Sequence, residues 1–475
     1  MSSRSCNARR ALVIGAGLVT VASVAAGLRN SLLGGDSYFT VVGADWILEH
    51  VRRGEWTGWK GLYPLLQTIP ALMLRAAGVS PDGVVWGFVA TNVLSFFGLL
   101  WLAWHSRRTT STALAVFLVA VMFSGPLLWY THTSFAEPLG AFLILALVVA
   151  CRERTGSLAV AALLVVAGFY KDTAFPFLPV LGVAASIRNP GWGCGDFVRR
   201  RLSALVIVTA VTAAVSAAFN YVRFGSVLNT SYLNPITLVP TLRIQASWFL
   251  AIWFSPNGGV ALFWPSMTLV LLLGAVAAMR TAKVTEPGRA RFLALLPAAL
   301  VAVVLLGVTV GLSRWWSPLG WAAWGPRLLL PWLPACAYVV LAAYPAEAGS
   351  LLAAFTHPTW RFAVFSVLLA AASIPQFAVV FSKTMWAQVF APDTACPQVP
   401  LVEKNADYYY RCAEHMLWTK GSMLGLAYSA AADGLSLLLS LGCVLVLTWL
   451  ISEARAKTPA SDTPRRVAAP PSRGA

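Results

Sequence analysis

Runs of apolar residues recur along nearly the whole chain, separated by shorter stretches that are polar or basic. Most of these runs approach the roughly 20 residues that an α-helix needs to cross a bilayer. We count 12 runs, at residues 11–28, 84–104, 113–129, 136–150, 158–169, 174–187, 202–219, 260–279, 292–312, 328–344, 362–380 and 422–450. The pattern predicts an all-α polytopic membrane protein with about 12 transmembrane helices.

The composition supports this class and excludes others. Of the 475 residues, 58% are hydrophobic and only 11% are charged, and the mean hydropathy is +0.71. A soluble protein carries roughly 25% charged residues. The chain is therefore neither an ordinary cytosolic enzyme, nor a coiled coil, nor a disordered protein.

The net charge of +17 is divided unevenly between the two sides of the predicted bundle. Alternating the spans places 21 basic and 6 acidic residues on the side of the N-terminus, against 14 basic and 11 acidic residues on the other side. Basic residues accumulate on the cytoplasmic side of membrane proteins. We therefore expect a multi-pass protein of the cytoplasmic (inner) membrane with both termini in the cytoplasm, and we attribute the charge to topology rather than to nucleic-acid binding.

The expected organisation is one transmembrane domain between two short cytoplasmic ends. Residues 1–10 form a basic N-terminus, and we expect the run that follows to be retained as a helix rather than cleaved as a signal peptide. Residues 11–450 form the transmembrane domain. Residues 451–475, rich in Pro, Ala, Ser and Arg, are expected to be a disordered cytoplasmic tail.

The longer connections fall on the predicted outer side, which is where we expect the chemistry. In the first of them, residues 38–51 and 62–76 have helical spacing and are expected to be amphipathic helices on the membrane surface. The long outer connections are residues 29–83, 220–259, 313–327 and 381–421.

Acidic residues and a histidine lie at the outer ends of predicted spans. Asp36 follows two glycines shortly after the first span, and it is either a helix N-cap or a functional carboxylate. Glu137 opens a span, where the helix dipole favours a carboxylate, and His132 lies five residues earlier. The helix dipole does not explain why Asp36, His132 and Glu137 all lie at the same predicted depth on one side of the membrane. Asp36 and Glu137 are therefore candidate catalytic residues. Asp433, inside the last predicted span, is expected to be a structural ion.

Basic and aromatic residues lie at the same level. Each one alone suits an interfacial anchor. A dense group of Trp and Arg suits a sugar ring that carries a phosphate, since Arg binds the phosphate and Trp packs against the ring. The candidates for binding a donor phosphate are Lys171, Arg223, Arg327 and Arg314, and those for contacting the sugar or the acceptor are His132, Trp315, Trp316, Trp324 and Asn257.

The cysteines indicate one candidate disulfide. Among the 7 cysteines, only Cys396 and Cys412 share an outer connection, so we favour a bridge between them over two free thiols. No spacing of Cys and His resembles a metal site, and dependence on a divalent metal is left open.

Four motifs follow one another along the chain, at residues 35–38 (GDSY), 220–226 (NYVRFGS), 254–259 (FSPNGG) and 324–331 (WGPRLLLP). Their order and spacing resemble the GT-C superfamily, most of all bacterial relatives of the dolichyl-phosphate-mannose-dependent mannosyltransferases. The resemblance implies a GT-C-like fold, with Asp36 as catalytic base and Glu137 as a second acid. It also implies that the lipid phosphate is held by Lys171, Arg223 and Arg327.

We therefore expect an inverting hexosyl- or pentosyltransferase, for example a mannosyltransferase. It would move a sugar from a polyprenyl-phosphate-linked donor to a glycan, glycolipid or protein acceptor on the outer face, with no certain cofactor. Asp36 would remove the acceptor proton, and cations would stabilise the leaving phosphate. Two alternatives stay open. Ser37 stands where many members have a second acid, which leaves a non-catalytic cell-envelope assembly protein, and the span count also suits a secondary transporter.

Overall fold

The computed structural model describes residue 21 and residues 36–55, 65–153, 156–171, 174–187, 195–228, 238–239, 241–315, 318–320, 324–356, 359–381, 417–418 and 434–457. Within the helices, the side chains of residues 36–39, 65, 195–201, 355, 356, 359 and 434–436 are not described. The first predicted span, at 11–28, and the connection 381–421 therefore lie almost wholly outside the described residues.

The described residues are largely helical, which confirms the predicted all-α class. The helices of 20 residues or more are α4 (Pro81–His105), α10 (Gly195–Phe224), α13 (Pro265–Val284), α14 (Arg289–Ser313), α17 (Thr359–Phe381) and α21 (Gly434–Lys457). The shorter ones are α2 (Asp36–Arg52), α3 (Leu65–Ala76), η1 (Ser106–Arg108), α5 (Thr112–Phe123), α6 (Leu127–Tyr130), α7 (Glu137–Arg152), α8 (Ser157–Tyr170), α9 (Leu178–Ser186), α11 (Leu242–Phe254), α12 (Val260–Phe263), η5 (Arg327–Leu329), α15 (Leu333–Ala343) and α16 (Pro345–Thr356).

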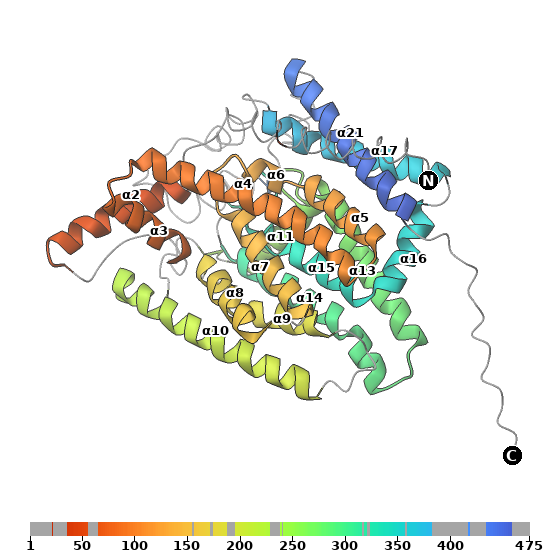
Figure 1. Cartoon of the computed structure of the whole chain (residues 1–475), viewed down its shortest axis with the longest axis horizontal. Coiled ribbons are helices and arrows are strands. Elements are labelled where there is room, and N and C mark those ends of the chain that lie inside the picture. Colours follow the sequence, from red (N-terminus) through yellow and green to blue (C-terminus); the bar gives the residue numbers. More distant parts are fainter. Residues whose placement is uncertain are drawn as a thin grey trace, which may run out of the picture.

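Short helices form the centre of the bundle and long helices surround them. α5, α7, α9 and α15 have between 9 and 16 residues, and most of their side chains are buried. In the long helices, half or fewer of the side chains in the apolar stretch are buried. Figure 1 shows α17 and α21 side by side at one edge and α10 along another.

The number of membrane spans is lower than predicted in the described part of the chain. There, 6 helices are long and apolar enough to cross a membrane, or up to 7 if α15 and α16, bent by 99°, count as one span. The protein is thus polytopic, but several predicted runs are interrupted. The run 113–129 is divided into α5 and α6 at Ser124, Gly125 and Pro126, and the run 260–279 is divided at Trp264.

The break after α5 has a packing cause. A Cβ atom on Gly125 would lie 2.2 Å from the ring of Trp264, so glycine is what lets this indole cover the end of α5. Nε1 of Trp264 donates a hydrogen bond to the carbonyl of Val121 at 2.8 Å. The turn therefore attaches the start of α13 to α5, and it does so by ending the helix early.

α2 and α3 form a hairpin that packs on the first turns of α4, and they correspond to the predicted surface helices at 38–51 and 62–76. Arg75 joins the two helices by binding Asp45, with Nε 2.5 Å from Oδ1 and Nη2 3.1 Å from Oδ2. The apolar cluster shared with α4 consists of Val41, Ala44, Ala71, Val84 and Val85.

Two predicted segments contain helical residues that the hydrophobic pattern did not assign. The predicted outer connection 220–259 contains a helix, α11, which begins where the side chain of Thr241 caps its first turn. The last helix continues to Lys457, past the predicted start of the disordered tail at 451. Lys457 pairs with Glu453 at 2.7 Å, a contact one turn apart that favours helix.

Arg152 holds together one end of the bundle, which we call the basic end. From the last turn of α7, its guanidinium donates to the carbonyl of Ile187 after α9 and to that of Ala342 in α15, each at 2.5 Å. The C-termini of helices expose unpaired carbonyls with partial negative charge. One buried cation therefore satisfies the ends of two neighbouring helices.

We expect Arg152→Met to lower the free energy of unfolding by about 3 kcal/mol, because buried carbonyls would lose their donors. Chemical unfolding of the purified protein in detergent measures this. Arg108→Ala is the matched control: this arginine is exposed, in η1, and its removal should change stability by less than about 0.5 kcal/mol. Equal effects of the two variants would contradict the assigned role of Arg152.

Candidate functional site

The other end of the bundle, which we call the site end, gathers segments that are far apart in the sequence. Residues 130–137, between α6 and α7, contact residues 324–327 through hydrogen bonds and an ion pair. Residues 255–259 pack against the same turn, since a Cβ atom on Gly258 would approach Leu319 and the carbonyl of Gly325. Three of the outer segments proposed from the sequence therefore meet in one place.

The centre of the site end is a buried ion pair between Glu137 and Arg327. Nε of Arg327 donates to Oε1 of Glu137 at 2.7 Å, and each side chain is 5% exposed. The guanidinium carbon also lies 3.8 Å from the ring centroid of Phe135. Oε2 of Glu137 is buried and has no hydrogen-bond partner among the described residues. A buried carboxylate oxygen without a donor is costly, so it marks a place where a ligand hydroxyl or a water could donate.

The turn that carries Arg327 is attached at three points through Trp324. The hydroxyl of Tyr130 donates to the carbonyl of Trp324 at 3.0 Å and accepts its backbone N–H at 3.1 Å. The indole Nε1 donates to Oε1 of Gln376 in α17 at 2.8 Å, and the ring lies edge-on to Phe263. The ring of Trp324 is 0% exposed, so it is part of the scaffold of the turn rather than an open platform for a sugar.

Asn92 of α4 fixes the segment before Glu137. Its amide donates to the carbonyls of Thr133 and Phe135. His132, in the same segment, is fully buried.

Lys171 lies near the pair, while the register of α8 and α10 places Arg223 farther away. The charge of Lys171 acts on the Glu137 carboxylate. A Cβ atom on Gly168 would touch Thr212, so these two positions are level. At 1.5 Å per residue, Lys171 lies about 5 Å beyond that level and Arg223 about 16 Å beyond it. The predicted cations thus lie at two levels along the bundle. We call the level of Lys171 and Arg327 the lower tier and the level of Arg223 the upper tier.

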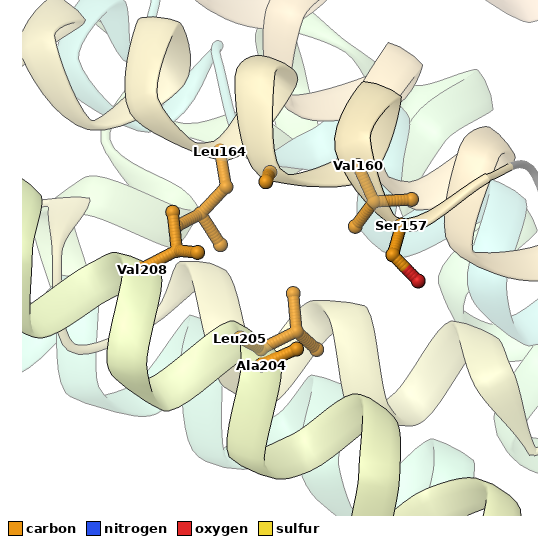
Figure 2. A pocket seen from close by; sticks show the side chains of 7 residues that line it. Ser157, Val160, Leu164, Ala204, Leu205 and Val208 are labelled. Atoms are coloured by element: carbon orange, nitrogen blue, oxygen red, sulfur yellow. The ribbon is translucent and has the colours of Figure 1, made fainter.

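Arg223 is buried in the last turn of α10, with its guanidinium against the rings of Phe219 and Phe224. Farther down the same seam, a pocket between α8 and α10 is lined almost entirely by apolar side chains (Figure 2). Leu164 and Val208 face one another across it. No charged residue lines this pocket.

The ion pair is recessed along the bundle. α7 has 16 residues between Glu137 and Arg152, a rise of about 24 Å. A hydrocarbon core is about 30 Å thick, so this helix is shorter than the thickness of a bilayer core. Asn92 also contacts the site from near the middle of the 25-residue α4. Glu137 thus lies nearer the middle of α4 than the first turns of that helix, where the α2–α3 hairpin packs.

Other predicted site residues lie at the periphery of the site end. Arg314 is exposed, and its carbonyl accepts the N–H of Val239, next to the bridge between Leu238 and Trp315. Trp315 is half-buried. Asn257 is also half-buried, and its N–H donates to Oγ of Ser255 at 3.0 Å. Among the described residues, the ion-pair partner of Glu137 is Arg327 and not Arg314.

Several predicted residues fall outside the described part of the chain. The backbone of Asp36 is described and opens α2, one turn before the buried Thr40, but its side chain is not. Trp316, Cys396, Cys412 and Asp433 lie outside the described residues altogether. Within the described residues, no group of three His, Cys, Asp or Glu side chains is placed to hold a metal ion.

Sequence reasoning missed three residues that build the site: Asn92, Tyr130 and Gln376. Asn92 and Gln376 are amide side chains within runs that are otherwise mostly apolar, and that contrast is the signal that could have identified them. Tyr130 carries no such signal, because an aromatic residue at the end of a span is ordinary.

No protein-family model and no curated protein matches the sequence. The chain is similar in structure to ArnT from Cupriavidus metallidurans in the apo state, with a TM-score of 0.41, 15% identity, and coverage of 94% of this chain and 78% of ArnT. ArnT bound to undecaprenyl phosphate gives a TM-score of 0.42 at 15% identity, with 93% and 78% covered.

A third similar structure is the Archaeoglobus fulgidus oligosaccharyltransferase tethered to an acceptor peptide. Its TM-score is 0.40 at 13% identity, with coverage of 83% of this chain and 59% of the oligosaccharyltransferase.

A double-mutant cycle tests the ion pair. Arg327→Met leaves the Glu137 carboxylate buried without its cation, and we expect unfolding free energy to fall by about 3–5 kcal/mol. Adding Glu137→Gln removes that charge, so the double variant should be more stable than Arg327→Met alone. Unfolding in detergent measures all four proteins. Additive losses would show that the two side chains do not interact.

Proposed function

We propose that this chain is an inverting glycosyltransferase that moves a sugar from a polyprenyl-phosphate-linked donor to an acceptor on the outer face of the cytoplasmic membrane. The observation that carries the proposal is the buried Glu137–Arg327 pair, with Lys171 close to it and one carboxylate oxygen unsatisfied. A cluster of this kind is costly to bury, and it suits a ligand that carries both a phosphate and hydroxyl groups.

Arg327 and Lys171 would hold the phosphate of the donor. A guanidinium has five N–H donors in a planar fork, so it can bind Glu137 along one edge and a phosphate oxygen along another. Lys171 adds a second positive charge on the same tier. Both charges are present before the reaction, and they stabilise the negative charge that grows on the phosphate as it leaves.

Glu137 would hold the sugar and orient Arg327. Oε1 receives the Nε hydrogen of Arg327, and Oε2 is available to accept a hydrogen bond from a sugar hydroxyl. Because this carboxylate is already paired with a cation, the general base is better supplied by a second acid. The sequence offers Asp36 for that task.

Asp36 would act from the upper tier. The α2–α3 hairpin packs on α4 around Val85, seven residues and about 10 Å from Asn92, which marks the lower tier. A sugar with its phosphate on Arg327 would extend across that interval. The acceptor oxygen gives its proton to Asp36 as it bonds to the anomeric carbon. The bond from that carbon to the phosphate oxygen breaks, and the lipid phosphate leaves with the electron pair.

The sidedness of the reaction follows from the charges. The basic end holds the predicted cytoplasmic connections, so the site end would face outwards. Arg223, about 12 Å above Lys171 by helix register, would then contact the acceptor or an outer part of the donor rather than the same phosphate oxygens as Lys171.

We expect Asp36→Asn to lower kcat for transfer at least about 100-fold while changing the KM for the donor less than about twofold, because a general base acts on the chemical step. The measurement is transfer of a radiolabelled sugar from a synthetic polyprenyl phosphate to membrane acceptors. Glu49→Gln is the control, since Glu49 is an exposed acid of α2, paired with Arg53. Full activity of Asp36→Asn would show that Asp36 is not the general base.

A further inference from the structure

Gln376 is a buried amide in α17, a helix that supplies none of the groups assigned to the reaction. We propose that Gln376 is a positioning residue: its side-chain carbonyl holds Trp324, and through the turn that follows it fixes the direction in which Arg327 meets the lipid phosphate. The inference rests on the proposed function and extends it to a residue that touches neither donor nor acceptor.

The orientation of the amide follows from its partner. An indole nitrogen can only donate, so the atom of Gln376 that faces Nε1 of Trp324, at 2.8 Å, must be the carbonyl oxygen Oε1. Nε2 then points elsewhere, and it is buried with no acceptor among the described residues. Gln376 itself is 1% exposed.

The unsatisfied Nε2 argues against a role in packing alone. A buried N–H without an acceptor lowers stability, and methionine has a similar length without this defect. If position 376 only filled space, an apolar residue would serve it better. The amide is useful because Trp324 needs an acceptor there, and Trp324 needs one because its ring is completely enclosed.

The effect reaches Arg327 through a short and constrained path. Trp324 is held by Tyr130 at its backbone and by Gln376 at its indole. Gly325 follows with φ at +71°, a conformation that other residues rarely adopt, and the N–H of Arg327 bonds back to the Gly325 carbonyl at 2.9 Å. A rotation of the indole would therefore be passed on to the guanidinium three residues later.

The kinetic test removes the side-chain oxygen of Gln376 that accepts the hydrogen bond from the indole of Trp324. Gln376→Met should raise the KM for the polyprenyl-phosphate sugar about tenfold, the size of one lost hydrogen bond, and should also lower kcat, because Arg327 stabilises the charge on the leaving phosphate. Gln376→Glu keeps an acceptor oxygen, so its KM for the polyprenyl-phosphate sugar should be close to that of the wild type. Ser373→Ala is the matched control, because Ser373 is a buried polar residue one turn earlier in α17 that bonds only to the carbonyl of Leu369. It should behave as wild type.

A cycle with Arg327 separates positioning from general destabilisation. The affinity for undecaprenyl phosphate is measured by its thermal stabilisation of each purified variant. In an Arg327→Gln background, Gln376→Met should cause no further loss of affinity, because the group that it positions is absent. An equal loss in both backgrounds, or wild-type KM in Gln376→Met, would overturn the inference.

A readout independent of ligand separates this inference from the proposed function. Hydrogen exchange of the amides of residues 324–330 should be about tenfold faster in Gln376→Met than in Ser373→Ala, with other helices unchanged. If the wild type neither transfers sugar nor binds undecaprenyl phosphate, the proposed function fails while this measurement still decides whether Gln376 holds the turn. Unchanged exchange in Gln376→Met would overturn the inference even in an active enzyme.

Discussion

The burial of Glu137 and Arg327 is the constraint on which the arrangement of the site end depends. Removing two charges from water costs several kcal/mol per ion, and their attraction offsets this only when the geometry is fixed. The structure fixes both partners by anchoring their backbones. Asn92 holds the segment before Glu137, and Tyr130 and Trp324 hold the turn before Arg327. The anchors are therefore a condition of the charge pair and not independent features of packing.

The lengths of the inner helices give the pair its depth. Helices of 9 to 16 residues rise about 14–24 Å, which is less than the hydrocarbon thickness. Because the long helices enclose them, the inner helices need not reach both membrane surfaces. The ends of α7 and η5 can therefore present Glu137 and Arg327 below the start of α4, where the α2–α3 hairpin packs. A recess of this kind excludes water from the charges, which strengthens their interaction with one another.

Much of the fold was predictable from hydrophobic pattern, because apolar runs and helical spacing report local structure. The surface helices α2 and α3 were placed within a few residues, and Glu137 and Arg327 were both selected as site residues. Their pairing was not, since they are 190 residues apart and no local signal joins them. The burial of Trp324 was not predictable either, because it is decided by tertiary contacts with Phe263 and Gln376. The break in the predicted run 113–129 was not predictable for the same reason, because it depends on the tertiary contact of Gly125 with Trp264.

The two buried arginines show why one end of the bundle suits chemistry and the other suits structure. Arg152 donates to carbonyls at the C-terminal ends of helices, so its charge is matched by the backbone itself. Arg327 instead meets a carboxylate at the N-terminus of α7, where the helix dipole already favours negative charge. Glu137 is thus stabilised twice, by the dipole and by the cation, yet Oε2 has no donor in the described structure. A protein that needed only a structural ion pair would gain by satisfying that oxygen. Leaving it open is consistent with a carboxylate whose last hydrogen bond is completed by substrate.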